Sequence, residues 1–253
     1  MVNRWAGYML LAGLAAIVPS AAQAQNTTFG TAVHLLVGQT PIRVTLTAAA
    51  PDHFYDAPVV AGRSYCAEAS ASETELNPAD PVLTLLRQDQ ATSLGPDISL
   101  MEPKGTQTAR VCFIAPATET AFIKLSPAPG FENREYTMRF LETTLFANWA
   151  FIGGDYLSFT LLRNTTNSQL SVNLTWRDTA GNIVATRTAQ AIAPNGIFFA
   201  EARSVLCPGP CTGQTSVEVA HAGSPEAIVG SQTTLSGATG LSFDTLTFQR
   251  RTW

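Results

Sequence analysis

The sequence predicts an all-β protein, built as two consecutive β-sandwich domains of jelly-roll or immunoglobulin-like type after a cleaved signal peptide. Short runs rich in Val, Ile, Thr, Phe and Tyr alternate between apolar and polar residues along most of the 253-residue chain. Gly, Pro, Asn and Asp separate these runs, as expected of turns. Helical periodicity is almost absent beyond the first residues, which argues against a helical protein.

Residues 1–24 have the composition of an export signal. Arg4 provides a positive start, residues 8–18 form an apolar run, and Ala22-Gln23-Ala24 matches the small-x-small site of a signal peptidase. An uncleaved membrane anchor is the alternative, but the apolar run is short for one. We therefore expect cleavage before Gln25 and an exported mature protein, in the periplasm or outside the cell, without a transmembrane segment.

Residues 25–146 are predicted to form the first sandwich. About eight alternating runs fall within this segment, at the spacing typical of a β-sandwich. The predicted strands lie near residues 32–37, 42–47, 54–60, 65–70, 82–87, 109–114, 121–125 and 136–141.

Residues 147–253 are predicted to form a second sandwich, which resembles no family. The predicted strands lie near residues 156–163, 170–177, 183–191, 197–202, 216–221, 228–234 and 241–249. Leu170, Val172, Leu174 and Trp176 alternate with polar residues and therefore share one face of a strand, which we expect to be the core face. Residues 178–182 carry Asp, Gly and Asn and predict a hairpin loop. The connection between the two domains is short, so we expect them to pack on each other.

Four cysteines follow the predicted signal peptide, and an even number in an exported protein indicates disulfides. They are Cys66, Cys112, Cys207 and Cys211. Three pairings are possible, and proximity in the sequence favours Cys66 with Cys112 and Cys207 with Cys211. The first bond would stabilise the fold by roughly 4 kcal/mol and the second by about 2 kcal/mol. A four-cysteine zinc site is the competing interpretation, but Cys66 and Cys112 lack the close second ligand that such sites use.

The motifs of common enzymes are missing, so we expect neither catalysis nor a cofactor. The sequence contains no Gly-x-Ser-x-Gly elbow, no His-Glu-x-x-His motif and no phosphate-binding glycine loop. The three histidines, His34, His53 and His221, are far apart in the sequence. Charged residues make up 13% of the chain and its formal net charge is −4. Because no basic stripe is present, nucleic acid is not expected as a partner.

Two groups of residues are candidates for ligand binding. Glu73, Glu75 and Asp80 form the densest acidic loop, a candidate calcium site whose alternative is a solvated loop. Trp149, Phe151 and Tyr156 cluster near the start of the second domain, where exposed aromatic rings could stack on the apolar faces of pyranose sugars. The alternative, which we favour from the sequence, is that these rings fill the end of the sandwich or form the contact between the domains.

The first half of the chain resembles the bacterial pre-peptidase C-terminal domain over roughly residues 30–142. Strand and turn motifs carry the resemblance: Gly38-Gln39-Thr40-Pro41, Asp52 to Tyr55, Ala61-Gly62-Arg63-Ser64-Tyr65, Phe113-Ile114-Ala115-Pro116, Phe122-Ile123-Lys124-Leu125, and Tyr136, Met138 and Phe140 in the last strand. It implies a jelly-roll-like sandwich in a secreted bacterial protein, of a family that assists secretion, localisation or substrate binding by proteases. This chain departs from that pattern because it carries no protease domain.

Together these features predict an exported, non-catalytic binding or adhesion protein. Its expected partner is an envelope polysaccharide or another cell-surface polymer, or else another exported protein. An accessory or inhibitor subunit of a separately encoded secreted hydrolase is the alternative, and an uncharacterised hydrolase is the third possibility.

Overall fold

The structure is a computed structural model that describes residues 26–71, 81–95, 108–127, 130, 133–206 and 213–250. The fold is nearly all-β, as predicted. Besides strands, the described residues form a short 3-10 turn, η1 (Phe29–Thr31), and one five-residue helix, α1 (Ala202–Leu206). The predicted signal peptide at 1–24 lies outside the described residues.

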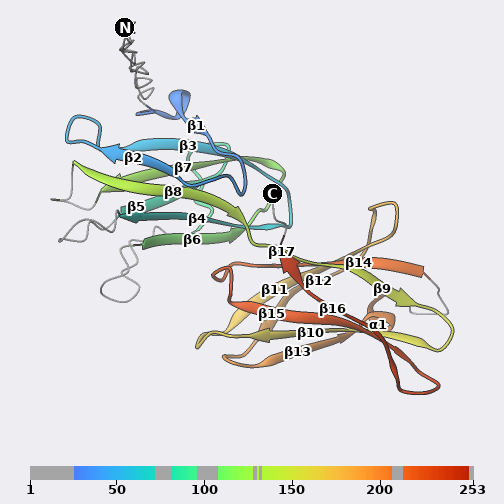
Figure 1. The fold of residues 1–253 in the computed structure, drawn as a ribbon. Helices are drawn as coiled ribbons and strands as arrows, with labels where there is room; N and C mark the ends of the chain where they lie inside the picture. The colour runs from blue at the N-terminus through green and yellow to red at the C-terminus, as the bar shows by residue number, and fades with distance from the viewer. Residues whose placement is uncertain are drawn as a thin grey trace, which may run out of the picture.

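The described part of the N-terminal half forms eight strands in two four-stranded sheets (Figure 1). The strands are β1 (Val33–His34), β2 (Ile42–Leu46), β3 (His53–Val59), β4 (Ser64–Ala71), β5 (Pro81–Leu86), β6 (Thr108–Ile114), β7 (Glu119–Pro127) and β8 (Arg134–Glu142). One sheet has the order β1-β3-β7-β5 and the other β2-β8-β4-β6. Every pairing in these sheets is antiparallel except that of β1 with β3.

A single apolar cluster fills the space between these two sheets. Alternation in the strands supplies it, because every second side chain points inward. In β3, for example, Tyr55, Ala57 and Val59 are buried while the residues between them are partly or fully exposed. Tyr65 of β4 and Phe140 of β8 stack with ring centroids 5.5 Å apart inside the cluster.

In the C-terminal half, the residues that the structure describes form nine strands in one five-stranded and one four-stranded sheet. The strands are β9 (Leu145–Ile152), β10 (Tyr156–Asn164), β11 (Leu170–Arg177), β12 (Ile183–Ile192), β13 (Ile197–Glu201), β14 (Gly213–His221), β15 (Ile228–Ser236), β16 (Ser242–Thr247) and β17 (Gln249–Arg250). The sheet orders are β12-β11-β14-β9-β17 and β13-β10-β15-β16.

The second apolar cluster is centred on β11. Val172, Leu174 and Trp176 are fully buried and Leu170 packs against them, so the core face predicted from their alternation is confirmed. The hairpin predicted at residues 178–182 joins β11 to β12. In this hairpin Gly181 has a φ of 88°, a conformation that residues with a side chain rarely adopt.

The chain passes from one half to the other through only two residues. β8 ends at Glu142 and β9, which begins at Leu145, already pairs with β14. The changeover thus lies at Thr143–Thr144, a little before the boundary at 146/147 expected from the sequence. Both threonines are fully buried. The Thr143 N–H donates to the Ser64 carbonyl at 2.8 Å, and the Ser64 N–H donates to the Thr144 hydroxyl at 2.9 Å.

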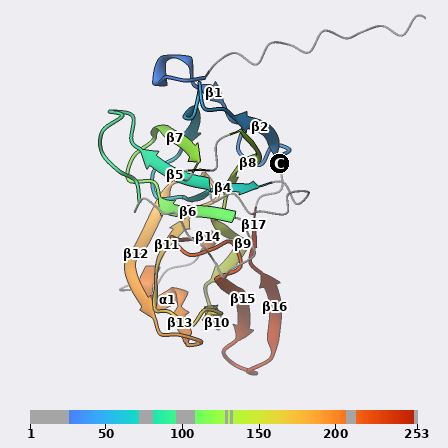
Figure 2. The same cartoon turned by 90° about the vertical axis from the view of Figure 1, so that its left-hand side faces the viewer.

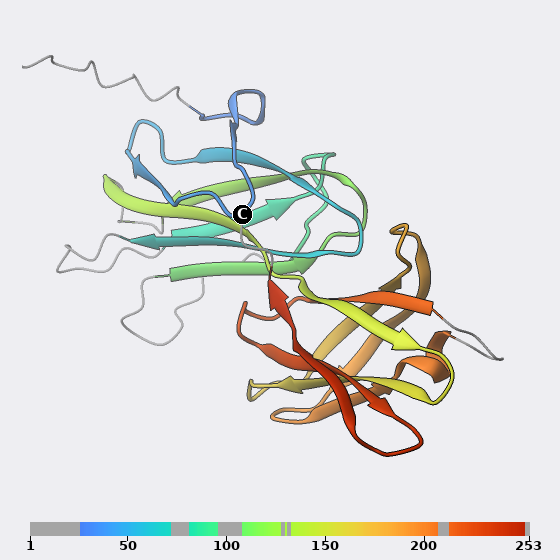
Figure 3. The same cartoon turned by 45° about the vertical axis from the view of Figure 1, so that its right-hand side comes forward.

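The two halves lie against each other, and the five-stranded sheet of the C-terminal half faces the N-terminal half (Figures 1 and 2). Figure 3 shows the chain leaving β8 and entering β9 at this contact. Among the described residues, no helix is long and apolar enough to cross a membrane.

Candidate functional site

A β-bulge in β9 gives its outer face an unusual composition. Val217 of β14 pairs with Ala147 and Thr215 pairs with Ala150, so Asn148 and Trp149 together oppose a single residue of β14. A bulge of this kind re-aims side chains and is common next to binding sites. The consequence is that Asn148 and Trp149, although adjacent in the sequence, both lie outside the core, whereas Ala147 and Ala150 on either side of them are buried.

The structure brings together the three aromatic residues singled out in the sequence. The rings of Trp149 and Phe151 are nearly parallel, with centroids 6.2 Å apart and an interplanar angle of 16°. Tyr156, at the start of β10, meets Phe151 edge-on with centroids 5.5 Å apart. Trp149 and Phe151 are half-buried and Tyr156 is 36% exposed. The three rings form a continuous strip at the β9–β10 end of the C-terminal half.

The position of Phe151 is fixed by Ser158 of β10. The Ser158 hydroxyl accepts a hydrogen bond from the Phe151 N–H at 3.0 Å and lies 2.6 Å from the Phe151 carbonyl. The same hydroxyl lies 2.7 Å from that of Thr234, and both side chains are buried. Ser158 therefore ties the aromatic strip to the opposite sheet.

A pocket of about 240 Å³ adjoins the aromatic strip. It lies on the outer face of the five-stranded sheet, across β9, β14 and the hairpin loop that follows β11, and is lined by Asn148, Trp149, Asp178, Thr179, Gln214, Thr215 and Ser216. Of the lining residues that the structure describes, Trp149 is the only aromatic one, and the other side chains carry amide, hydroxyl or carboxylate groups. The pocket therefore combines one apolar wall with several hydrogen-bonding groups.

Asp178 shapes one wall of the pocket. Its carboxylate accepts hydrogen bonds from the N–H groups of Ala180 and Asn182 and from the Asn182 side chain, at 2.8 to 3.1 Å. The hydrogen bonds from Asn182, above all, lower the pKa of Asp178 below its ordinary value. The carboxylate is thus charged at neutral pH and holds the hairpin that presents Thr179 to the pocket.

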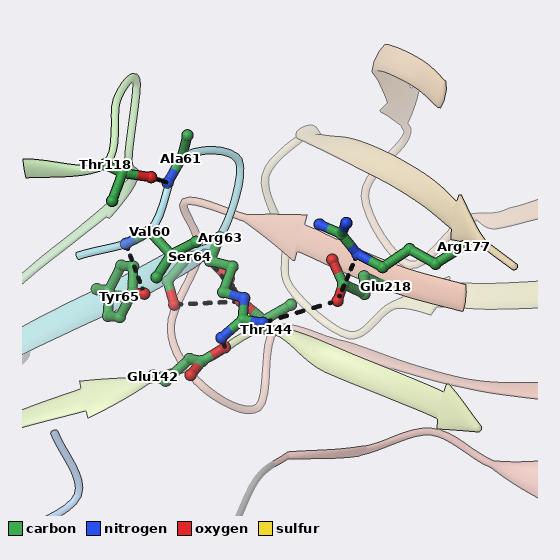
Figure 4. Close-up of polar contacts among 10 residues, drawn as sticks. All are labelled: Val60, Ala61, Arg63, Ser64, Tyr65, Thr118, Glu142, Thr144, Arg177 and Glu218. Atoms are coloured by element: carbon green, nitrogen blue, oxygen red, sulfur yellow. Dashed lines mark hydrogen bonds and ion pairs between the residues drawn. The ribbon is translucent and has the colours of Figure 1, made fainter. Parts of the chain in front are cut away.

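A network of charged residues joins the pocket region to the N-terminal half (Figure 4). Arg63 lies 3.5 Å from Glu142 and 3.9 Å from Glu218 of β14, measured between guanidinium nitrogen and carboxylate oxygen. Glu218 also pairs with Arg177 of β11 at 3.1 Å. Arg177 directly precedes Asp178, and Glu218 lies two residues beyond Ser216. The network therefore runs from the N-terminal half to the edge of the pocket.

The turn that carries Arg63 is held from several sides. Gly62 has a φ of 78°, and the Arg63 N–H donates to the Val60 carbonyl, closing a tight turn. The Val60 N–H donates to the Tyr65 hydroxyl and the Ala61 N–H to the Thr118 hydroxyl, both at 3.0 Å (Figure 4). These contacts place the Arg63 guanidinium against the C-terminal half, where it lies 5.7 Å from the centre of the Phe146 ring.

The disulfide predicted between Cys66 and Cys112 is present and joins residues that face each other on β4 and β6. It lies at the contact between the halves, because the Cys66 sulfur is 3.9 Å from the Gly223 carbonyl oxygen. A bonded sulfur carries no proton, so this is a van der Waals contact rather than a hydrogen bond. Cys207 and Cys211, predicted to form the second disulfide, lie outside the described residues.

The described residues bring no histidine within hydrogen-bonding distance of a serine. His34 lies 2.5 Å from Asp56 on the surface of the N-terminal half. His53 and His221 are buried, and burial lowers the pKa of both, that of His221 to about 4. Within the part of the chain that the structure describes, no group of three or more His, Cys, Asp or Glu side chains could hold a metal ion. Glu73, Glu75 and Asp80, the predicted calcium ligands, lie outside it.

Comparisons with known proteins give little further information. No protein-family model matches the chain and no curated protein matches its sequence. Among solved structures, the N-terminal CBM22-1–CBM22-2 tandem domain of Xyn10C from Paenibacillus barcinonensis is 7% identical, with a TM-score of 0.23 over 78% of this chain and 82% of that one. A β-glucuronidase of glycoside hydrolase family 2 is 9% identical, with a TM-score of 0.21 over 78% of this chain and 23% of the enzyme. Scores of this size do not establish a shared fold.

Proposed function

We propose that this chain is an exported, non-catalytic protein of two β-sandwich domains that binds a cell-surface polysaccharide through the outer face of its second sandwich. The observation that carries the proposal is the bulge in β9, which presents Asn148 and Trp149 side by side next to Gln214 and Ser216 of β14.

The chemistry of this face suits a sugar. A pyranose ring has an apolar face of C–H groups, which stacks on an aromatic ring, and a rim of hydroxyls that both donate and accept hydrogen bonds. Trp149 and Phe151 provide the aromatic surface. The amides of Asn148 and Gln214 and the hydroxyls of Ser216 and Thr179 provide paired donors and acceptors beside it.

The shape of the site favours binding of a polymer over catalysis. The aromatic strip extends from the pocket to Tyr156, so a sugar chain can continue beyond a single ring. Glycoside hydrolysis ordinarily uses two carboxyl groups on either side of the bond that is cleaved. Among the described residues that line the pocket, Asp178 is the only carboxylate, and it is engaged in its own hairpin.

Location outside the cytoplasm is part of the proposal. The Cys66–Cys112 disulfide supports it, because such bonds persist in oxidising compartments. The export signal expected at residues 1–24 and the resemblance of the first half to the pre-peptidase C-terminal domain point in the same direction.

The proposal is tested by binding of the purified protein to a panel of insoluble polysaccharides and peptidoglycan, measured by co-sedimentation. The native protein is expected to bind at least one polymer, and Trp149→Ala to weaken that binding by about tenfold or more. The matched control is Phe29→Ala, which removes a half-buried aromatic side chain from the N-terminal half. Absence of binding across the panel, or equal binding by the Trp149 variant, would contradict the proposal.

A further inference from the structure

The central strand of the four-stranded sheet in the C-terminal half, β10, buries polar residues and exposes apolar ones at several positions. The inward-facing residues of its central strand β10 include Ser158, Thr160 and Asn164, all fully buried. Their hydroxyl and amide groups are hydrogen-bonded inside the protein; Thr160, for example, donates to Gln232 of β15 at 2.6 Å. The outward-facing residues of β10 are Leu157, Phe159, Leu161 and Arg163. Three successive outward-facing side chains are thus apolar, whereas on the inward side only Leu162 joins the apolar core.

Neighbouring strands extend this exposed apolar surface, which we call the β10 face. It consists of Leu157, Phe159, Leu161, Ile197, Phe199, Val229 and Leu235. Ile197 is 66% exposed, Phe199 58%, Val229 48% and Leu161 42%. Phe159 and Phe199 stack with centroids 5.1 Å apart. The face lies on the side of the C-terminal half that points away from the N-terminal half (Figure 1). A contiguous apolar patch of this kind marks an interaction site.

Two opposite charges flank the centre of the β10 face. Leu161 of β10 pairs directly with Phe199 of β13. Arg163 lies two residues beyond Leu161, and Glu201 two residues beyond Phe199. Since the strands are antiparallel, the two charges lie toward opposite ends of the face. Among the residues that the structure describes, neither side chain forms an ion pair within the chain.

We propose that the β10 face binds a second copy of this chain in a symmetric dimer. The two-fold axis lies in the plane between two such faces and crosses the strands near the Leu161–Phe199 pair. It brings Leu161 of one copy against Leu161 of the other, and Phe199 against Phe199. The same operation reverses the strand direction, so Arg163 of one copy meets Glu201 of the other, and Glu201 of the first meets Arg163 of the second. The surface is therefore complementary to itself, as a two-fold interface requires.

The size of the face is consistent with a weak dimer. The face lies on β13, β10 and β15, which are five, nine and nine residues long. Strands about 4.8 Å apart with ~3.4 Å per residue then cover roughly 400 Å², or about 800 Å² over two copies. This value lies below the range for stable specific interfaces and matches a weak, transient dimer. The dimer would leave the pocket accessible, because the pocket lies on the outer face of the other sheet.

A charge-swap experiment with the full chain tests this proposal. Sedimentation equilibrium from about 1 to 300 μM gives the dissociation constant of the dimer. The native protein is expected to dimerise, and Arg163→Glu and Glu201→Arg are each expected to raise the dissociation constant by about tenfold or more, because like charges then meet twice in each dimer. An equimolar mixture of the two variants is expected to recover near-native association. In the mixed dimer the two introduced side chains carry opposite charges and face each other, as do the retained Glu201 of one variant and Arg163 of the other.

The mixture separates this proposal from an effect on folding, because no intramolecular change can explain recovery by mixing. Arg43→Glu, which makes the same charge change at an exposed site in the N-terminal half, is the control and should associate like the native protein. A native chain that remains monomeric throughout, or a mixture that associates no better than either variant alone, would overturn the proposal. So would a dimer that both single variants leave intact.

Discussion

Arg63 of the N-terminal half lies 3.9 Å from Glu218 of the C-terminal half, between Nη2 and Oε1, and it also lies 3.5 Å from Glu142. The side chain of Arg63 is only 16% exposed and that of Glu142 only 2%. The Arg63 guanidinium therefore lies between two carboxylates at the contact between the halves, of which Glu218 also pairs with Arg177. Its loss removes a positive charge from beside them in a region of low dielectric constant.

The first prediction concerns this contact. Arg63→Ala is expected to lower the free energy of unfolding by about 3 kcal/mol, because it breaks a largely buried ion pair. Arg43→Ala, which breaks the exposed pair with Glu135, should cost less than about 1 kcal/mol. Urea denaturation measures both values. Equal losses in the two variants would show that the Arg63 contact contributes no more than a surface pair.

A second prediction concerns the disulfide. Replacing Cys66 and Cys112 together by serine should lower the free energy of unfolding by roughly 4 kcal/mol, because the bond restricts the unfolded chain. Guanidinium denaturation of the native protein and the double variant provides the measurement. A difference below about 1 kcal/mol would indicate that the bond contributes little to the fold.

The third prediction is a loss of stability in acid caused by His221. Burial and the nearby Arg250 charge lower its pKa from 6.5 to about 4. The unfolded chain therefore binds a proton at a higher pH than the folded chain does. The stability that this pKa difference gives the folded chain is fully present above pH 6.5 and is lost as the pH falls toward 4. The total decrease in the free energy of unfolding is about 3 kcal/mol.

His221→Leu removes this titrating group and should reduce the dependence of stability on pH between those values. The part that remains comes from His53, whose pKa is also lowered by burial. The measurement is the free energy of unfolding of both proteins at several pH values from 7 down to 4. The carboxyl groups of Asp89 and Asp178 also have lowered pKa values, below the ordinary value of 3.8. They therefore change the free energy of unfolding only at lower pH. A variant that remains as acid-sensitive as the native protein would rule out His221 as the cause.

Much of the fold could be predicted because it depends on local alternation. Strands β10, β11 and β12 begin at the predicted residues, and the turn at residues 178–182 was identifiable from its Asp, Gly and Asn. Strand β9 was missed. Its sequence, Leu145-Phe146-Ala147-Asn148-Trp149-Ala150-Phe151-Ile152, does not alternate, because the bulge places two consecutive residues outside the core. The bulge that creates the site thus also removed the apolar–polar alternation by which a strand is recognised in a sequence.

The polar part of the site could not be predicted for a different reason. The sequence identified Trp149, Phe151 and Tyr156 as a cluster, and the structure brings them together. Gln214, Ser216 and Asp178 join them only because β14 lies between β11 and β9 in the sheet. Sheet order depends on contacts between distant segments, which alternation does not report. The burial of Ser158, Thr160 and Asn164 on β10 is similarly a property of packing, since alternation alone does not say which face is buried.

A fourth prediction concerns the support of the aromatic strip. Ser158→Ala removes the hydroxyl that bonds the Phe151 backbone and Thr234. It should lower the free energy of unfolding by about 2 kcal/mol, because buried polar groups lose their partner. It should also weaken polysaccharide binding, although Ser158 itself is buried. Thermal denaturation together with co-sedimentation tests both effects. Unchanged binding by a destabilised variant would show that the strip does not depend on Ser158.

The central claim is that a sugar stacks on Trp149, and fluorine NMR of protein labelled with 5-fluorotryptophan tests it most directly. Trp149 is half-buried beside the pocket, whereas Trp176 is fully buried in the core and serves as an internal reference. Addition of a soluble oligosaccharide from the bound polymer should shift the Trp149 resonance, assigned with Trp149→Phe, and leave that of Trp176 in place. Binding that leaves the Trp149 resonance unmoved would contradict the account.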